Sequence, residues 1–203
     1  MVRALVLLLL VLRPGTLRAE QTDRDRAVHA ASTVGLAASY FVIEFVLKKK
    51  LIPDRCRWCK PPAIDRGIRQ RVVWDHRKRA DVLSDITGYY GAPLITWGLL
   101  FAAAGDDRSA RGWYDDAIPV LESLIIVSLL HHAVKFSVGR QRPYAQFGRP
   151  GRKSDRDENM SFFSGHTSAA FAVAVSAGVV AEQRGYRLAP AIWASGLTLA
   201  AAT

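Results

Sequence analysis

Four long segments of this 203-residue chain lack lysine and arginine, although its formal net charge is +10. These segments, residues 86–104, 117–134, 167–181 and 188–203, contain a single acid, Glu122, whereas residues 48–79 contain twelve Lys or Arg and three acids. The sequence also lacks recognition-helix, RNP and zinc-finger patterns, so we expect no nucleic-acid partner. Basic loops between apolar helices instead suit an anionic headgroup surface or a phosphate substrate.

No Gly/Ser-rich or Pro-rich linker divides the chain, which indicates one domain. At the N-terminus, an apolar run from Ala4 to Leu12 is too short to span a bilayer and precedes a Pro-Gly break. This pattern predicts a secretory signal peptide over residues 1–19, with an uncleaved anchor as the alternative because Leu17 stands where a small residue is preferred. The domain itself is expected over residues 25–203.

Stretches of alternating polar and apolar residues are rare, which argues against β-structure. Long apolar segments punctuated by Gly, Pro and charged residues instead predict an all-α helical bundle. The segments are apolar on nearly every face, which favours helices embedded in a membrane over the core helices of a soluble bundle. Between Lys48 and Arg79 the pattern is amphipathic and charged, as expected of a helix at the membrane interface or of an ordinary solvated helix.

Cysteine is scarce, and the only two cysteines, Cys56 and Cys59, form one C-x-x-C pair. A zinc site would need two further ligands that are not nearby in the sequence, so we expect no metal. In a secreted protein such a pair can close a small disulfide loop, and two free thiols are the alternative. No βαβ pattern surrounds the pair, which argues against a thioredoxin-like redox role.

The stretch K-F-S-V-G-R-Q-R-P begins with Lys135 at the end of an apolar, helix-like segment. Gly139 can terminate that helix, and Pro143 favours an extended conformation at Arg142. The ammonium group of Lys135 and the guanidinium group of Arg142 can therefore converge on one point from two directions.

A second polar motif, Ser164-Gly165-His166, opens the next apolar segment. A serine followed by glycine at a helix start offers a hydroxyl group and accessible backbone N–H groups, supported by the positive end of the helix dipole. Together with Lys135 and Arg142, these groups form an anion cradle of the kind that phosphoryl transfer requires.

Lys135-x6-Arg142-Pro143 followed by Ser164-Gly165-His166 resembles the first two signature segments of the type 2 phosphatidic acid phosphatase superfamily, which also contains vanadium haloperoxidases and bacterial class A acid phosphatases. The phrases R-C-R-W-C-K and D-E-N-M-S-F-F-S-G-H-T resemble a proteobacterial branch with signal peptides. The resemblance implies an α-helical bundle and phosphatase activity without a metal or other cofactor. It also implies that Lys135, Arg142, Ser164 and Gly165 hold the phosphate and that His166 protonates the departing oxygen.

The third signature segment of that superfamily, which supplies a nucleophilic histidine, has no match here, because no histidine and no charged residue follows Arg187. His131 lies one helical turn before Lys135 and is a weak candidate for the nucleophile, the alternative being a polar residue within the bundle. We expect the missing segment to lie beyond Thr203 and the domain to be incomplete at its C-terminus, so that the 203 residues alone turn over little substrate.

The resulting hypothesis is a metal-independent phosphatase that hydrolyses a lipid phosphate or pyrophosphate through a phosphohistidine intermediate. A non-catalytic phosphate- or headgroup-binding protein is the alternative, and a vanadate-dependent haloperoxidase is less favoured. We expect a multi-pass protein of the bacterial inner membrane. Positive-inside counting places the cradle in the cytoplasm, whereas the resemblance points to the periplasmic face, which we favour.

Overall fold

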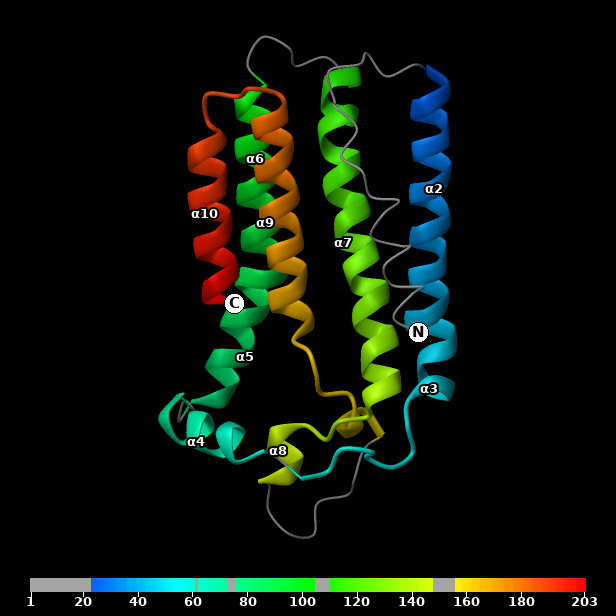
Figure 1. Cartoon of the computed structure of the whole chain (residues 1–203), viewed down its shortest axis with the longest axis vertical. Coiled ribbons are helices and arrows are strands. Elements are labelled where there is room, and N and C mark those ends of the chain that lie inside the picture. The colour runs from blue at the N-terminus through cyan, green and yellow to red at the C-terminus, as the bar shows by residue number, and fades with distance from the viewer. Residues whose placement is uncertain (1–22, 61, 73–75, 105–109, 148–155) are drawn as a thin grey trace.

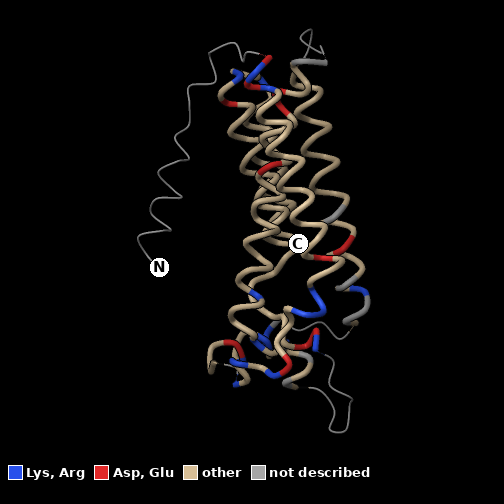
Figure 2. The backbone as a smooth tube through the Cα atoms, turned by 90° about the vertical axis from the view of Figure 1, so that its right-hand side faces the viewer, with Lys and Arg blue, Asp and Glu red and all other residues tan. Residues whose placement is uncertain are grey.

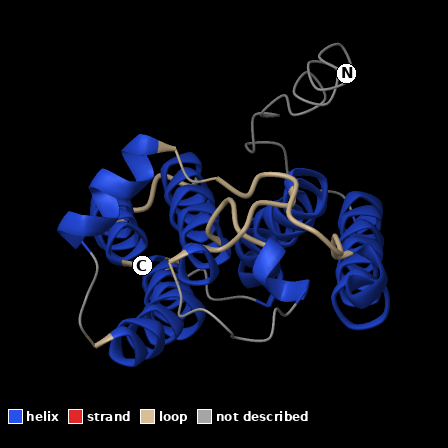
Figure 3. Cartoon of the chain, turned by 90° about the horizontal axis from the view of Figure 1, so that it is seen from below, coloured by secondary structure: helices blue, strands red, loops and turns tan. Residues whose placement is uncertain are grey.

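A computed structural model describes residues 23–60, 62–72, 76–104, 110–147 and 156–203 (Figure 1). The expected signal peptide, residues 1–19, lies outside the described residues. The described part of the chain contains helices and loops but no strands, as the all-α prediction requires (Figure 3).

The long helical segments of the described residues run along the long axis of the molecule (Figure 1). They are α2 (Asp23–Phe41) with its π-helical continuation η1 (Val42–Leu47), α6 (Ala92–Ala103), α7 (Ala110–Val138), α9 (Gly165–Gln183) and α10 (Ala189–Ala202). The shorter elements gather at the lower end in Figure 1. They are α3 (Lys48–Leu51), α4 (Ala63–Val72), α5 (Arg77–Asp85), the π-helix η2 (Ile86–Gly91), α8 (Pro143–Gln146) and the 3-10 helix η3 (Arg156–Asn159).

Helix α9 is the centre of the bundle and packs against α6, α7 and α10. Its buried residues are mostly small, which allows the neighbouring helices to approach closely. At Gly178, α9 and α10 are so close that any side chain would clash, because a Cβ atom there would lie 2.4 Å from the ring of Trp193 on α10. Larger buried residues, among them Leu100, Val120 and Ile192, complete the core around α9.

Polar contacts join α2 to α7 along their length. Arg26 donates to both carboxylate oxygens of Asp115 at 3.0 Å, and Thr33 donates to Glu122 at 2.7 Å. Nearer the lower end, Glu44 lies 2.6 Å from Nε2 of His132. Because the outward side chains of this segment, such as Val34 and Phe45, are 68% and 73% exposed, these polar contacts rather than a large apolar core fix α2.

Among the described residues, two helices are long and apolar enough to cross a membrane, and they cover Asp23–Leu51 and Gly112–Val138. Only 6% and 17% of their apolar windows are buried inside the protein, so most of this apolar surface faces outward. Lys, Arg, Asp and Glu gather at the two ends of the bundle and are sparse in its middle (Figure 2). This distribution is typical of a bundle whose middle contacts lipid, and it supports association with a membrane.

Candidate active site

A pocket with a volume of about 1130 Å³ opens at the lower end of the bundle. It is lined by all five residues that the sequence analysis assigns to a phosphate site, namely Lys135, Arg142, Ser164, Gly165 and His166. These residues come from the end of α7, the loop before α8 and the beginning of α9. Two motifs that are about twenty residues apart in the sequence therefore meet at one pocket.

The first motif adopts the backbone conformation that its sequence predicts. Helix α7 ends at Val138, and Gly139 follows it with a φ of +55°, a conformation that favours glycine. Arg142 is extended, with φ −66° and ψ 143°, immediately before Pro143. The chain therefore turns sharply between Lys135 and Arg142, and both side chains reach the same pocket.

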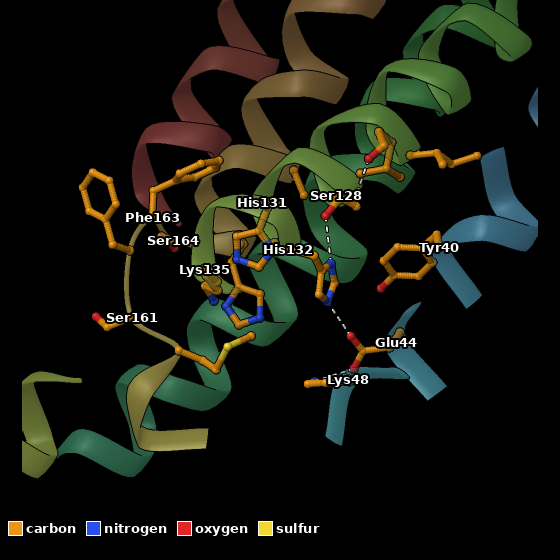
Figure 4. Close-up of a pocket in the computed structure, with 18 of the residues that line it drawn as sticks. Tyr40, Glu44, Lys48, Ser128, His131, His132, Lys135, Ser161, Phe163 and Ser164 are labelled. Carbon is orange, nitrogen blue, oxygen red and sulfur yellow. Dashed lines mark hydrogen bonds and ion pairs between the residues drawn. The ribbon is translucent and has the colours of Figure 1, made fainter. Parts of the chain in front are cut away.

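Lys135 and Arg142 differ in their partners. Arg142 donates from Nε to the carbonyl oxygen of Asp157 at 3.1 Å and from Nη2 to its carboxylate at 3.0 Å. The ammonium group of Lys135 has no hydrogen bond or ion pair among the described residues, although it lines the pocket (Figure 4). An ammonium group at a pocket wall that makes no such bond can donate hydrogen bonds to a bound anion.

Ser164 is the N-cap of α9. Its hydroxyl oxygen accepts hydrogen bonds from the backbone N–H of Thr167 at 3.4 Å and from the Thr167 hydroxyl at 3.1 Å. This capping arrangement fixes the first turn of α9, where the positive end of the helix dipole favours a bound anion. Helix α9 thus begins at the pocket with its electropositive end.

His166 is oriented by residues from α5 that no sequence motif indicated. Its Nδ1 lies 3.2 Å from the hydroxyl of Ser84, and its Nε2 lies 3.4 Å from a carboxylate oxygen of Asp85. The Ser84 hydroxyl also contacts the carbonyl oxygen of Thr203, at the end of α10. Gly88 of η2 allows this close packing, because a Cβ atom there would lie 3.2 Å from the Cβ of His166.

The two histidines of α7, His131 and His132, also line the pocket. In His132, Nδ1 contacts the carbonyl oxygen of Ser128 at 2.8 Å and Nε2 contacts Glu44 (Figure 4). In His131, Nε2 is buried and has no hydrogen-bond partner within the described structure. This geometry favours the polar bundle residue over the nucleophile for His131.

Glu44 and Lys48 add a second polar group to the pocket, opposite Lys135. The Nζ of Lys48 donates to Glu44 at 2.5 Å, and the other carboxylate oxygen of Glu44 binds His132. Glu44 belongs to the π-helix η1, and π-helical turns within α-helices are frequent at functional sites. In the sequence, Glu44 lies inside an apolar segment, and an acid in such a segment is a signal of function or of pairing.

Cys56 and Cys59 form a disulfide bond with a Cα–Cα distance of 5.4 Å, which lies in the usual range for such bonds. No group of three or more metal-binding side chains occurs in the described part of the chain.

Comparison with known proteins identifies one family. Residues 116–203 match the model of the PAP2 superfamily, and this range contains every residue of the cradle. No curated protein and no solved structure matches the chain. The match begins within α7, so α2 to α6 lie outside it.

Proposed function

Residues 116–203 match the PAP2 superfamily, and from that premise we propose that the chain is a metal-independent phosphatase acting on a lipid phosphate or pyrophosphate. The observation that carries the proposal is the ammonium group of Lys135, which lacks a partner among the described residues and shares its pocket with Arg142, Ser164, Gly165 and His166. A tetrahedral phosphoryl group presents three oxygens to such donors. Its transfer is catalysed mainly by positioning and by neutralising these oxygens.

In the proposed reaction, Lys135, Arg142 and the first N–H groups of α9 hold the phosphoryl oxygens. An imidazole attacks phosphorus as the bond to the leaving oxygen breaks, and His166 donates a proton to that oxygen. Water then attacks the phosphohistidine and releases inorganic phosphate. The attacking imidazole is expected from the third signature segment, to which these 203 residues contain no match.

A lipid substrate is supported by the surroundings of the cradle. The same pocket extends along Leu121, Leu124 and Ile125 of α7 and Val173 of α9, which are apolar. The two candidate membrane spans also border it. A substrate with a phosphate headgroup and an apolar chain would fill both parts, and we propose that the protein lies in the bacterial inner membrane with the pocket on the periplasmic side.

Binding experiments in detergent test this proposal. The 203-residue protein is expected to bind orthovanadate, with a water-soluble phosphate and a lipid phosphate both competing and the lipid phosphate competing more strongly. Binding should persist with a chelator present, since no metal is required. Equal competition by the two phosphates would contradict the lipid substrate. Failure to bind orthovanadate at all would reject the phosphate site.

A further inference from the structure

The Cys56–Cys59 loop lies against the segment that carries the arginine of the cradle. Backbone N–H groups of Arg57 and Trp58 both donate to the carbonyl oxygen of Gly139, at 2.9 and 3.4 Å, and the N–H of Gln141 donates to the carbonyl oxygen of Trp58 at 3.1 Å. Arg57 also donates from Nη1 to the carbonyl oxygen of Ser137 at 2.8 Å. The end of α7 and the residues after it are therefore bonded to the disulfide loop on one side.

On its other side, the same segment is bonded to the residues before α9. The backbone N–H of Ser161 donates to the carbonyl oxygen of Arg140 at 2.9 Å, and the backbone N–H of Arg142 donates to the carbonyl oxygen of Glu158 at 2.7 Å. Residues 139–142 thus lie between the disulfide loop and residues 158–161. The backbone of Arg142 is bonded to Glu158, and that of the preceding residue, Gln141, is bonded to Trp58 of the disulfide loop.

Side chains also connect the disulfide loop, residues 139–142 and the residues before α9. The guanidinium group of Arg140 lies 4.8 Å from the ring of Trp58 and 5.9 Å from that of Phe162, and it forms an ion pair with Asp65 of α4. The Trp58 and Phe162 rings are 6.1 Å apart. Trp58 therefore connects the disulfide loop to the arginine segment and to the residue two positions before Ser164.

We propose that Trp58, held in the loop closed by Cys56–Cys59, is a positioning residue for the phosphate cradle: it fixes residues 139–142 and thereby the place of Arg142. This inference rests on the proposed phosphate site and assigns a role to the R-C-R-W-C-K motif, which the phosphatase chemistry leaves unused. A disulfide restricts the backbone of the intervening residues. Trp58 consequently presents one fixed ring face and two fixed backbone groups to the arginine segment.

The proposal can be tested on the 203-residue protein in detergent with orthovanadate as the probe. Trp58→Ala, the double variant Cys56→Ser/Cys59→Ser and wild type treated with a dithiol are compared. The dithiol transfers two electrons and two protons, so the disulfide becomes two thiols and the reagent closes to its own disulfide. Each change is expected to raise the dissociation constant about three- to tenfold, which corresponds to the loss of one cation–π contact.

Two controls separate positioning from general stability. Trp58→Phe keeps an aromatic face for Arg140 and is expected to retain most of the wild-type affinity. The dithiol should leave the Cys56→Ser/Cys59→Ser variant unchanged, since that variant has no disulfide. Wild-type affinity in Trp58→Ala and in the reduced protein, together with weakened binding in Lys135→Ala, would overturn the positioning role while leaving the phosphate site intact.

Hydrogen exchange tests, independently of anion binding, whether Trp58 and the disulfide loop fix residues 139–142. Reduction or Trp58→Ala should accelerate exchange of the backbone N–H groups in residues 139–142, with little change in the middle of α9. This measurement remains informative if the wild-type protein binds no orthovanadate, in which case the proposed function fails on its own. Unchanged exchange in residues 139–142 after reduction would reject the positioning role of Trp58 in either case.

Discussion

The imidazole of His131 lies directly against Gly165. A Cβ atom at position 165 would come within 2.9 Å of Cε1 and 3.0 Å of Nε2 of His131, closer than side-chain atoms normally approach. The glycine of the Ser-Gly-His motif is therefore required by packing against α7, in addition to any need for a bound anion to approach the backbone. The end of α7 and the beginning of α9 are consequently fitted to each other at the cradle.

Gly165→Ala is expected to disturb this fit, because the half-buried ring of His131 has little space in which to move. Overpacking of this kind typically costs about 1–3 kcal/mol of unfolding free energy. We expect a lower midpoint of thermal unfolding and weaker orthovanadate binding. The double variant Gly165→Ala/His131→Ala removes the ring that the new methyl group would meet, and it should recover part of both losses. A double variant that is no better than Gly165→Ala alone would contradict this account of the contact.

Substitutions in the cradle should weaken anion binding without unfolding the bundle. Lys135→Ala and Arg142→Ala each remove a charged donor, and hydrogen bonds to charged groups are worth about 1.5–3 kcal/mol, so we expect orthovanadate affinity to fall tenfold or more. Ser164→Ala should have a smaller effect and should also loosen the cap of α9. Calorimetry measures the affinity, and circular dichroism reports the helices.

Arg187→Ala provides a control for that series, because Arg187 is an exposed cation that follows α9 at the opposite end of the bundle (Figure 1). It should leave orthovanadate affinity at the wild-type value. If it weakened binding as much as Arg142→Ala does, the cations would be acting through net charge rather than through a defined cradle.

Much of this architecture could be predicted from the sequence. The apolar segments and their punctuation predict helices, and the structure places α6, α7, α9 and α10 over the segments expected to be helical. Gly139, Pro143 and Ser164 predict local backbone geometry, since each acts on its immediate neighbours. The meeting of Lys135 and Arg142 at one pocket follows from these short-range rules.

Other features of the site depend on tertiary packing and left no signal in the sequence. Ser84 and Asp85 precede His166 by about eighty residues and belong to no motif, yet the fold places them beside its ring. Asp157 lies between Arg142 and Ser164 in the sequence, and only the fold shows that its carboxylate accepts a hydrogen bond from Arg142. The pairing of Glu44 with His132 likewise joins segments that are 88 positions apart.

Asp116 is expected to be important for stability rather than for binding. It is buried at the end of the bundle opposite the pocket, where its carboxylate accepts hydrogen bonds from Arg184 at 2.7 Å and Tyr186 at 2.6 Å. Asp116→Ala leaves both donors without this partner and should cost about 3–6 kcal/mol, since each of the two bonds to a charged group contributes about 1.5–3 kcal/mol. Thermal unfolding measures the loss, and orthovanadate affinity at low temperature should remain close to wild type. A large loss of affinity in the folded variant would contradict the separation of the two ends.

The last prediction concerns turnover and the role of His166. The 203-residue chain is expected to bind a lipid phosphate and to hydrolyse it slowly or not at all, because both ring nitrogens of His132 are bonded, the unpartnered Nε2 of His131 is buried, and His166 is assigned to the leaving oxygen. The same chain continued through a downstream Arg…His segment should release phosphate in the presence of a chelator. In that active form, His166→Ala should lower kcat by about 10²–10⁴-fold, the usual contribution of a general acid, with a much smaller effect on orthovanadate binding.

Ser84→Ala and Asp85→Asn, which remove the groups that orient the His166 ring, should lower kcat less than His166→Ala. Activity of the 203-residue chain that disappears with His131→Ala would instead make His131 the nucleophile, and an inactive continued chain would favour a headgroup-binding protein over an enzyme.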